Sequence, residues 1–185
     1  MKYTETYIKG VWLIEPRRFG DARGYFMETF KRDEFERETG VSADFVQDNE
    51  SFSRHGVVRG LHFQRGEYSQ AKLVRVSRGR VVDVVVDLRR GSVTYGRHVA
   101  VELSADNALQ LFVPRGFAHG FVVTGEEAQF QYKVDNIYAP KAECTLRYDD
   151  PALGIDWILP PEEILRSEKD LNGLPFAEIA EISGF

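Results

Sequence analysis

Hydrophobic and polar residues alternate with a period of two along much of the middle of the chain, which is typical of β-strands. Four segments rich in Val, Phe and Tyr carry the pattern: residues 72–88, 98–103, 109–114 and 128–138. Turn-forming residues punctuate the region at 78–79, 90–92, 105–107 and 124–125. Strands at this spacing predict an all-β sandwich or barrel and not a parallel α/β sheet.

Helical patterns are scarce and short. Residues 31–40 (KRDEFERETG) place one Phe among helix-forming charged residues and end on Gly, which predicts a surface helix. Residues 160–165 (PPEEIL) offer Pro and two acids for a first helical turn. We expect the segment after Pro151, which is less β-like, to pack over the barrel as a covering tail. Because 185 residues contain no repeat or linker, the sequence predicts one domain over residues 1–185.

Charge is distributed unevenly along the chain. The 24 Lys and Arg against 29 Asp and Glu give a net charge of −5, which speaks against general nucleic-acid binding. Residues 54–80 nevertheless hold seven Arg or Lys and one acid. A local basic patch on an acidic protein favours a small anionic ligand, although a basic strand face in solvent is the alternative.

The cysteine count and the N-terminal sequence limit the class of protein. Cys144 is the only cysteine, which excludes an intrachain disulfide framework and a Cys-rich zinc site. The longest apolar run near the N-terminus is VWLI. We therefore expect a cytoplasmic protein without a signal peptide or membrane span.

The strand-like stretch VVRGLHFQ (57–64) contains the first candidate site. His62 lies in it, with Arg59 just before and Lys72 ten residues later. Cationic side chains in an apolar strand are costly unless they have partners or line a pocket. Because Arg59 and His62 are three apart, an ideal strand would send them to opposite faces. We expect a bulge or bend at Gly60 to re-aim one of them.

The preceding stretch FVQDNESFS (45–53) adds polar side chains. In an extended strand, Gln47, Asn49 and Ser51 project to one face. Such a row is expensive to bury without partners, so it predicts the wall of a water-filled pocket.

The stretch VPRGFAHGF (113–121) fits the pattern P-x-G-x-x-H, which ends on His119. It resembles the second motif of the cupins, small double-stranded β-helix barrels. Metal-binding cupins pair this motif with an earlier H-x-H, whereas here Phe63 and Gln64 follow His62. Two histidines without a clear third ligand make a weak metal site, and we expect no metal.

Without a metal, the chemistry falls to acid–base side chains. His62 can accept a proton at neutral pH, and Lys72 supplies a positive charge for a developing oxyanion. Tyr132 shares a strand face with Phe130 and Val134, so its hydroxyl can point inward as a donor; an ordinary core tyrosine is the alternative. This set suits proton abstraction next to a carbonyl.

Seven stretches, which follow one another in order between residues 21 and 170, carry a resemblance to a known family. They are DARGYFMETF, FVQDNESFSRHGVVRGLHFQ, QAKLVRVSRGRVVDVVVDLRRGSVTYG, VPRGFAHGF, YKVDNIYAP, DDPALGIDW and SEKD. In combination they resemble the dTDP-4-dehydrorhamnose 3,5-epimerases, which are cofactor-free enzymes of the cupin superfamily. The resemblance implies a cupin-type jelly-roll barrel with a few short peripheral helices, and no cofactor. It also implies conversion of dTDP-4-dehydro-6-deoxy-D-glucose to dTDP-4-dehydro-L-rhamnose on the route to L-rhamnose.

The resemblance assigns catalytic roles to four residues. His62 removes the protons on C3 and C5, and Asp170 of SEKD orients it. Lys72 steadies the enolate at the C4 oxygen. Tyr132 returns a proton from the opposite face, which inverts the stereocentre.

The resemblance also implies a substrate-binding set and a homodimer. Tyr138 should stack on the thymine, with Phe26 as a second aromatic contact. Family members exchange N-terminal strands, so Arg23 and Glu28 should serve the neighbouring subunit's site. The remaining expected binding residues are Gln47, Asp48, Asn49, Arg59, His119, Glu143 and Lys169.

Three other functions stay open from the sequence. A related enzyme inverting only C3 or only C5 would share these motifs. A non-catalytic cupin could bind the sugar nucleotide without chemistry, and a metal-dependent cupin is a more distant alternative.

Overall fold

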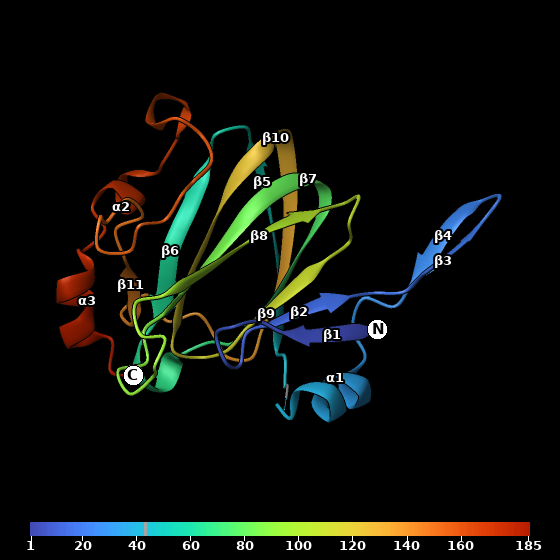
Figure 1. Cartoon of the computed structure of the whole chain (residues 1–185), viewed down its shortest axis with the longest axis horizontal. Helices are drawn as coiled ribbons and strands as arrows, with labels where there is room; N and C mark the ends of the chain where they lie inside the picture. Colours follow the sequence, from blue (N-terminus) through green and yellow to red (C-terminus); the bar gives the residue numbers. More distant parts are fainter. Residues whose placement is uncertain (43) are drawn as a thin grey trace.

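The computed structural model describes residues 1–42 and 44–185 and is built mainly of antiparallel strands (Figure 1). The main sheet follows the order β1-β2-β9-β7-β10-β6-β11, with β5 on β10 and β8 on β7. The main-sheet strands are β1 (Lys2–Glu5), β2 (Trp12–Glu15), β5 (Gln47–Arg54), β6 (Val58–Gln64), β7 (Lys72–Asp87), β8 (His98–Ser104), β9 (Gln110–Val113), β10 (Phe117–Val134) and β11 (Glu143–Thr145). The expected all-β class and jelly-roll barrel with a few short helices are confirmed.

Two long strands, β7 and β10, lie in the middle of the main sheet and pair along most of their length. The sequence predicted turns at Arg78–Gly79 and Thr124–Gly125, and both predictions are wrong, because each strand continues through its glycine. The β7–β10 register instead shifts beside these positions, between Val123 and Ala128. A bulge there bends both strands without ending them. The predicted turns at 90–92 and 105–107 do occur.

Helices are short and peripheral. The predicted helix is present as α1 (Arg32–Thr39), which buries Phe35 and ends on Gly40 with a φ of +70°. The first helical turn expected at PPEEIL forms only a 3₁₀ turn, Pro161–Glu163 (η2), because the chain then becomes extended. Further 3₁₀ and helical segments are η1 (Gly66–Tyr68), α2 (Glu168–Leu171) and α3 (Phe176–Ile182).

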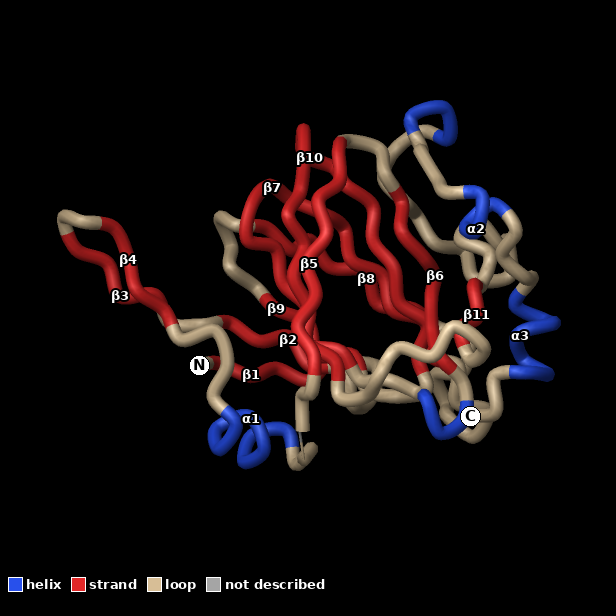
Figure 2. The backbone as a smooth tube through the Cα atoms, turned by 180° about the vertical axis from the view of Figure 1, so that it is seen from behind, coloured by secondary structure: helices blue, strands red, loops and turns tan. Residues whose placement is uncertain are grey.

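The C-terminal segment covers the barrel beside β6 and β11, as expected for a covering tail (Figure 2). Trp157 and Ile179 from this segment pack into one apolar cluster with Leu61 and Val122. A second cluster fills the barrel itself. Packing of the tail brings α2 into contact with β6.

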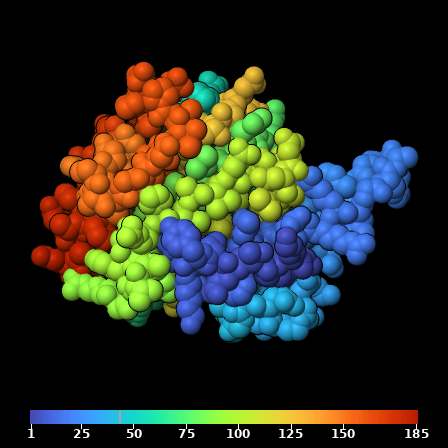
Figure 3. Space-filling model, in the orientation of Figure 1, coloured from blue at the N-terminus to red at the C-terminus, as the bar shows by residue number. Residues whose placement is uncertain are grey.

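A hairpin of β3 (Arg18–Asp21) and β4 (Gly24–Met27) stands away from the barrel (Figures 1 and 3). It forms its own two-stranded sheet and exposes three aromatic side chains: Phe19, Tyr25 and Phe26. Among the helices of the described residues, none is long and apolar enough to cross a membrane.

Candidate active site

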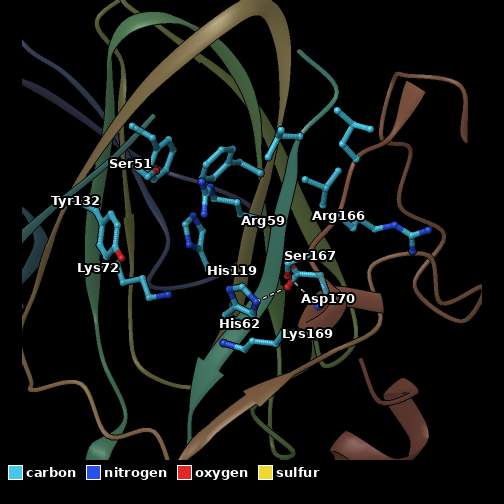
Figure 4. Close-up of a pocket in the computed structure, with 15 residues that line it drawn as sticks. Ser51, Arg59, His62, Lys72, His119, Tyr132, Arg166, Ser167, Lys169 and Asp170 are labelled. Carbon is cyan, nitrogen blue, oxygen red and sulfur yellow. Dashed lines mark hydrogen bonds and ion pairs between the residues drawn. The ribbon is translucent and has the colours of Figure 1, made fainter. Parts of the chain in front are cut away.

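A cavity of about 510 Å³ opens between β6, β7, β10 and the segment leading into α2 (Figure 4). Its polar lining includes His62, Lys72, His119 and Tyr132. Apolar side chains complete the lining, among them the stacked rings of Phe121 and Phe130, whose centroids lie 4.2 Å apart. A cavity in which polar and charged groups converge beside aromatic rings is suited to a small polar molecule.

His62 and Asp170 form a hydrogen-bonded pair at one wall of the cavity. Nε2 of His62 lies 2.6 Å from Oδ1 of Asp170, and the aspartate side chain is only 4% exposed. Burial alone would raise the pKa of Asp170, but hydrogen bonds from His62 and Ser167 outweigh it and lower that pKa. The ionised carboxylate therefore accepts the Nε2–H of His62, and Nδ1 makes no hydrogen bond to any residue that the structure describes.

Arg59 and His62 both line the cavity although they are three residues apart. The β6–β10 register shifts between the pairs His62–His119 and Arg59–Phe121, so β6 carries one extra residue there. Gly60 lies in this bulge with a φ of +116°. The bend predicted at Gly60 is therefore confirmed, and it turns both side chains to the cavity.

His119 lies across from His62 and has its own buried aspartate. Its Nε2 is 2.9 Å from Oδ1 of Asp83, and both side chains are buried. Burial lowers the pKa of His119, partly offset by the attraction of Asp83, so the imidazole stays neutral near pH 7. The two histidines thus stand side by side, each oriented by a carboxylate.

Lys72 begins β7 and points into the cavity beside Tyr132 (Figure 4). Burial lowers the pKa of its ammonium from the usual 10.5 to about 8, while Asp83 and Glu143 raise it part of the way back. Within the described residues its Nζ makes no hydrogen bond or ion pair, so it is available to a substrate oxygen.

Tyr132 points inward, as expected, from the strand face that also carries Phe130. Burial raises its pKa, with a smaller opposing effect of Arg59, so the phenol keeps its proton at neutral pH. The ring lies across the cavity from His62 (Figure 4). A base and a proton donor therefore face the same space from two sides.

Three expected binding residues form a network near the dyad. Glu143 accepts a hydrogen bond of 2.7 Å from the hydroxyl of Tyr138. It also forms an ion pair with Lys169. Tyr138 is exposed, so its ring is free to stack on a planar ligand.

The structure brings the expected residues of β5 together only in part. Asn49 faces Tyr132 in the register and accepts a hydrogen bond from Gln47, 2.7 Å long. Ser51 lines the cavity. Gln47, Asp48 and Asn49 do not line the cavity, and Asp48 forms an ion pair of 2.8 Å with Lys133.

The structure does not bring Arg23, Phe26 or Glu28 to the cavity of their own chain. All three lie in or just after the projecting hairpin. The Arg23 side chain is 90% exposed and pairs with Asp21 at 2.6 Å. Their expected role in a neighbouring subunit's site stays a prediction.

Sequence reasoning missed Asp83 and Ser167. Asp83 interrupts the apolar run VVDVVVDL, and a carboxylate buried in a strand requires a partner, which was the available signal. Ser167 caps α2 through the amide of Asp170 and also donates to Oδ2 of that residue at 2.7 Å. The spacing S-x-x-D was the sign of this cap.

Within the described residues, no group of three or more His, Cys, Asp or Glu is arranged to hold a metal ion. The arrangement offers instead a base, an oxyanion partner and a proton donor around one cavity.

Comparisons with known proteins agree on one family. The model of the family described as dTDP-4-dehydrorhamnose 3,5-epimerase matches residues 5–178. The chain is 52% identical over 157 residues to the enzyme of that name from Escherichia coli, covering 85% of each chain. It is similar to the crystal structure of the Elizabethkingia anophelis enzyme, with a TM-score of 0.93, 50% identity and coverage of 96% of this chain and 97% of that one. It is also similar to a Legionella pneumophila epimerase solved with dTDP-4-keto-L-rhamnose, at 43% identity, a TM-score of 0.93 and coverage of 99% and 97%.

Proposed function

The chain belongs to the dTDP-4-dehydrorhamnose 3,5-epimerase family and is an isomerase, and we propose that it inverts C3 and C5 of dTDP-4-dehydro-6-deoxy-D-glucose. The product is dTDP-4-dehydro-L-rhamnose, on the route to dTDP-L-rhamnose. One observation carries the proposal: the cavity places the His62–Asp170 pair on one wall and Lys72 and Tyr132 on the other.

Proton abstraction is the first step. The C4 ketone acidifies the protons on C3 and C5, and Nδ1 of His62 removes one of them. Asp170 holds the imidazole in the required tautomer and stabilises the imidazolium that forms. The electron pair of the broken C–H bond passes to the C4 oxygen and gives an enolate.

Lys72 stabilises that enolate as an ammonium beside the C4 oxygen. One such donor supplies about 3–4 kcal/mol. Tyr132 then donates its phenolic proton to the same carbon from the opposite face, which inverts the stereocentre. Proton exchange with solvent returns His62 and Tyr132 to their starting states, and repetition at the other carbon completes the reaction.

Binding of the nucleotide falls to the residues around the reacting groups. Arg59 matches the diphosphate because its guanidinium can meet two oxygens at once. Tyr138 provides a face for the thymine, and His119 binds the sugar. Polar contacts come from Lys169 and its ion-pair partner Glu143, and from Gln47 and Asn49, whereas Asp48 is held away from the cavity by its ion pair with Lys133.

The functional unit is a homodimer of single-domain chains (1–185) acting in the cytoplasm. The exposed hairpin supports this, because it carries Arg23 and Phe26 away from the cavity of its own chain. In the dimer these residues and Glu28 reach the partner's site.

Incubation with the 4-keto sugar nucleotide in D₂O tests the function. Deuterium at both C3 and C5, with inversion at both, is the expected result. Label and inversion at only one carbon would indicate a monofunctional epimerase. Binding without any exchange would indicate a non-catalytic cupin, and loss of activity with a chelator would indicate a metal-dependent one.

A further inference from the structure

The segment of residues 160–171, called here the strap, runs past the cavity and carries the aspartate of the dyad. It contributes five of the residues that line the cavity: Leu165, Arg166, Ser167, Lys169 and Asp170. In Figure 4 the labelled members of this set, Arg166, Ser167, Lys169 and Asp170, lie on the side of the cavity opposite Tyr132. The position of the strap therefore determines where the carboxylate of Asp170 lies.

The strap is held to the turn that precedes β6. The amide of Leu165 donates to the carbonyl of Gly56 at 2.8 Å, and the amide of Val58 donates to the carbonyl of Leu165 at 2.9 Å. These bonds flank a parallel bridge between Val57 and Leu165. His62 follows this turn on β6, so one short piece of chain locates both members of the dyad.

Gly56 allows this close approach. It has a φ of +79°, and a Cβ atom on it would lie 2.1 Å from the carbonyl oxygen of Glu163. That contact is with backbone, so the strap itself would have to move to accept a side chain.

A side-chain bridge acts at the same place. Nε2 of His55 lies 3.1 Å from Oε2 of Glu163, while Nδ1 lies 2.9 Å from the carbonyl oxygen of Gly125. The ring thus joins the strap to β10 at Gly125. Both residues are partly exposed, so the bridge adds orientation more than stability.

We propose that Gly56 and the His55–Glu163 bridge are positioning residues, which set the place of Asp170 against His62 by seating the strap. The role in turnover rests on the proposed epimerase function, whereas the seating of the strap does not. The backbone bonds carry most of the attachment, and the bridge refines it.

Gly56→Ala tests the proposal, with Gly40→Ala as the matched control. Gly40 has a φ of +70° and nothing within 4 Å of an added Cβ, so both variants carry the same backbone penalty and only Gly56→Ala displaces the strap. A misplacement of about 1 Å costs on the order of 10²-fold in kcat. We expect that loss for Gly56→Ala, with a smaller change in dTDP affinity and faster hydrogen exchange at the amides of Val58 and Leu165.

Two further measurements keep the test decisive. If Gly56→Ala does not fold, Glu163→Ala replaces it; we expect faster exchange at the same amides and lower kcat, with Glu163→Gln closer to wild type. In the ligand-free variants, the downfield N–H resonance of the His62–Asp170 hydrogen bond should weaken. This measurement tests the position of the strap even if the wild-type protein is not an epimerase. A folded Gly56→Ala or Glu163→Ala variant with the kcat, amide exchange and resonance of the Gly40→Ala control would overturn the proposal.

Discussion

Nε2 of His62 lies 2.6 Å from Oδ1 of Asp170, although 108 residues separate the two along the chain. The carboxylate is nearly inaccessible, so its charge is directed at the imidazole and at the capping Ser167 and not at water. A base so oriented has one free nitrogen, and it faces a cavity that also holds an ammonium and a phenol. That geometry supports the acid–base chemistry of the proposed epimerisation.

Removing the charge of Asp170 should remove the orientation of the base. Asp170→Asn is expected to lower kcat by about 10²–10⁴-fold, because the amide favours the wrong tautomer of His62. Deuterium incorporation into the 4-keto sugar nucleotide measures this. The exposed Asp149→Asn variant should behave as wild type, and a similar loss in both would contradict the dyad.

Replacement of Tyr132 separates exchange from inversion. In Tyr132→Phe, His62 still removes a proton from the sugar carbon and returns one to the same face. Deuterium from the solvent should therefore enter the sugar, while the rate of inversion falls by about 10²–10⁴-fold. NMR of the sugar product distinguishes the two. If inversion persists at the wild-type rate, Tyr132 is a core tyrosine and another group is the donor. Tyr68→Phe, outside the cavity, serves as the control.

Deprotonation of Lys72 should be visible in the dependence of kcat/KM on pH. The ammonium stabilises the enolate only when protonated, so kcat/KM should fall as pH rises through about 8. Lys72→Met should lose this limb and about 10²–10³ in rate at neutral pH. An unchanged limb in that variant would assign it to a different group.

Asp83 should set the pH at which kcat/KM falls. Its carboxylate raises the pKa of Lys72, so Asp83→Asn removes that support and should move the fall in kcat/KM to lower pH. Glu143 acts in the same direction and Lys169 in the opposite one, and both remain in the variant. Asp87→Asn is the matched control, because Asp87 is equally buried on β7 but bonds Arg89 outside the cavity. A limb that moves equally in both would reflect general destabilisation.

Gly60 should tolerate no side chain. A Cβ there would lie 2.7 Å from both the Cα of Gly120 and the carbonyl oxygen of His119. Gly60→Ala should therefore destabilise the fold by about 2–4 kcal/mol in denaturant unfolding. Gly24→Ala has a similar positive φ and open space around it, so it isolates the backbone penalty. Equal losses in the two variants would show that the close approach to β10 costs nothing.

Local sequence determined the class of fold and the chemistry available. Alternating apolar positions can bury one face only as strands, and the residues able to move protons, His62, Lys72 and Tyr132, were visible from their type and context. The bend at Gly60 also followed from the local sequence. Arg59 and His62 are three residues apart, so they can face the same cavity only if the strand is irregular between them. These features depend on near neighbours in the chain.

Contacts between distant segments were decided only by the tertiary structure. From its residues alone, Asp170 was one acid among many, and only the resemblance paired it with His62; the docking of the tail produces the contact. The turns predicted in β7 and β10 became bends because each strand pairs with the other on both sides of its glycine. The projection of Arg23 away from the cavity likewise depends on packing. Periodicity reports which face a residue occupies, whereas burial and long-range pairing decide what that face meets.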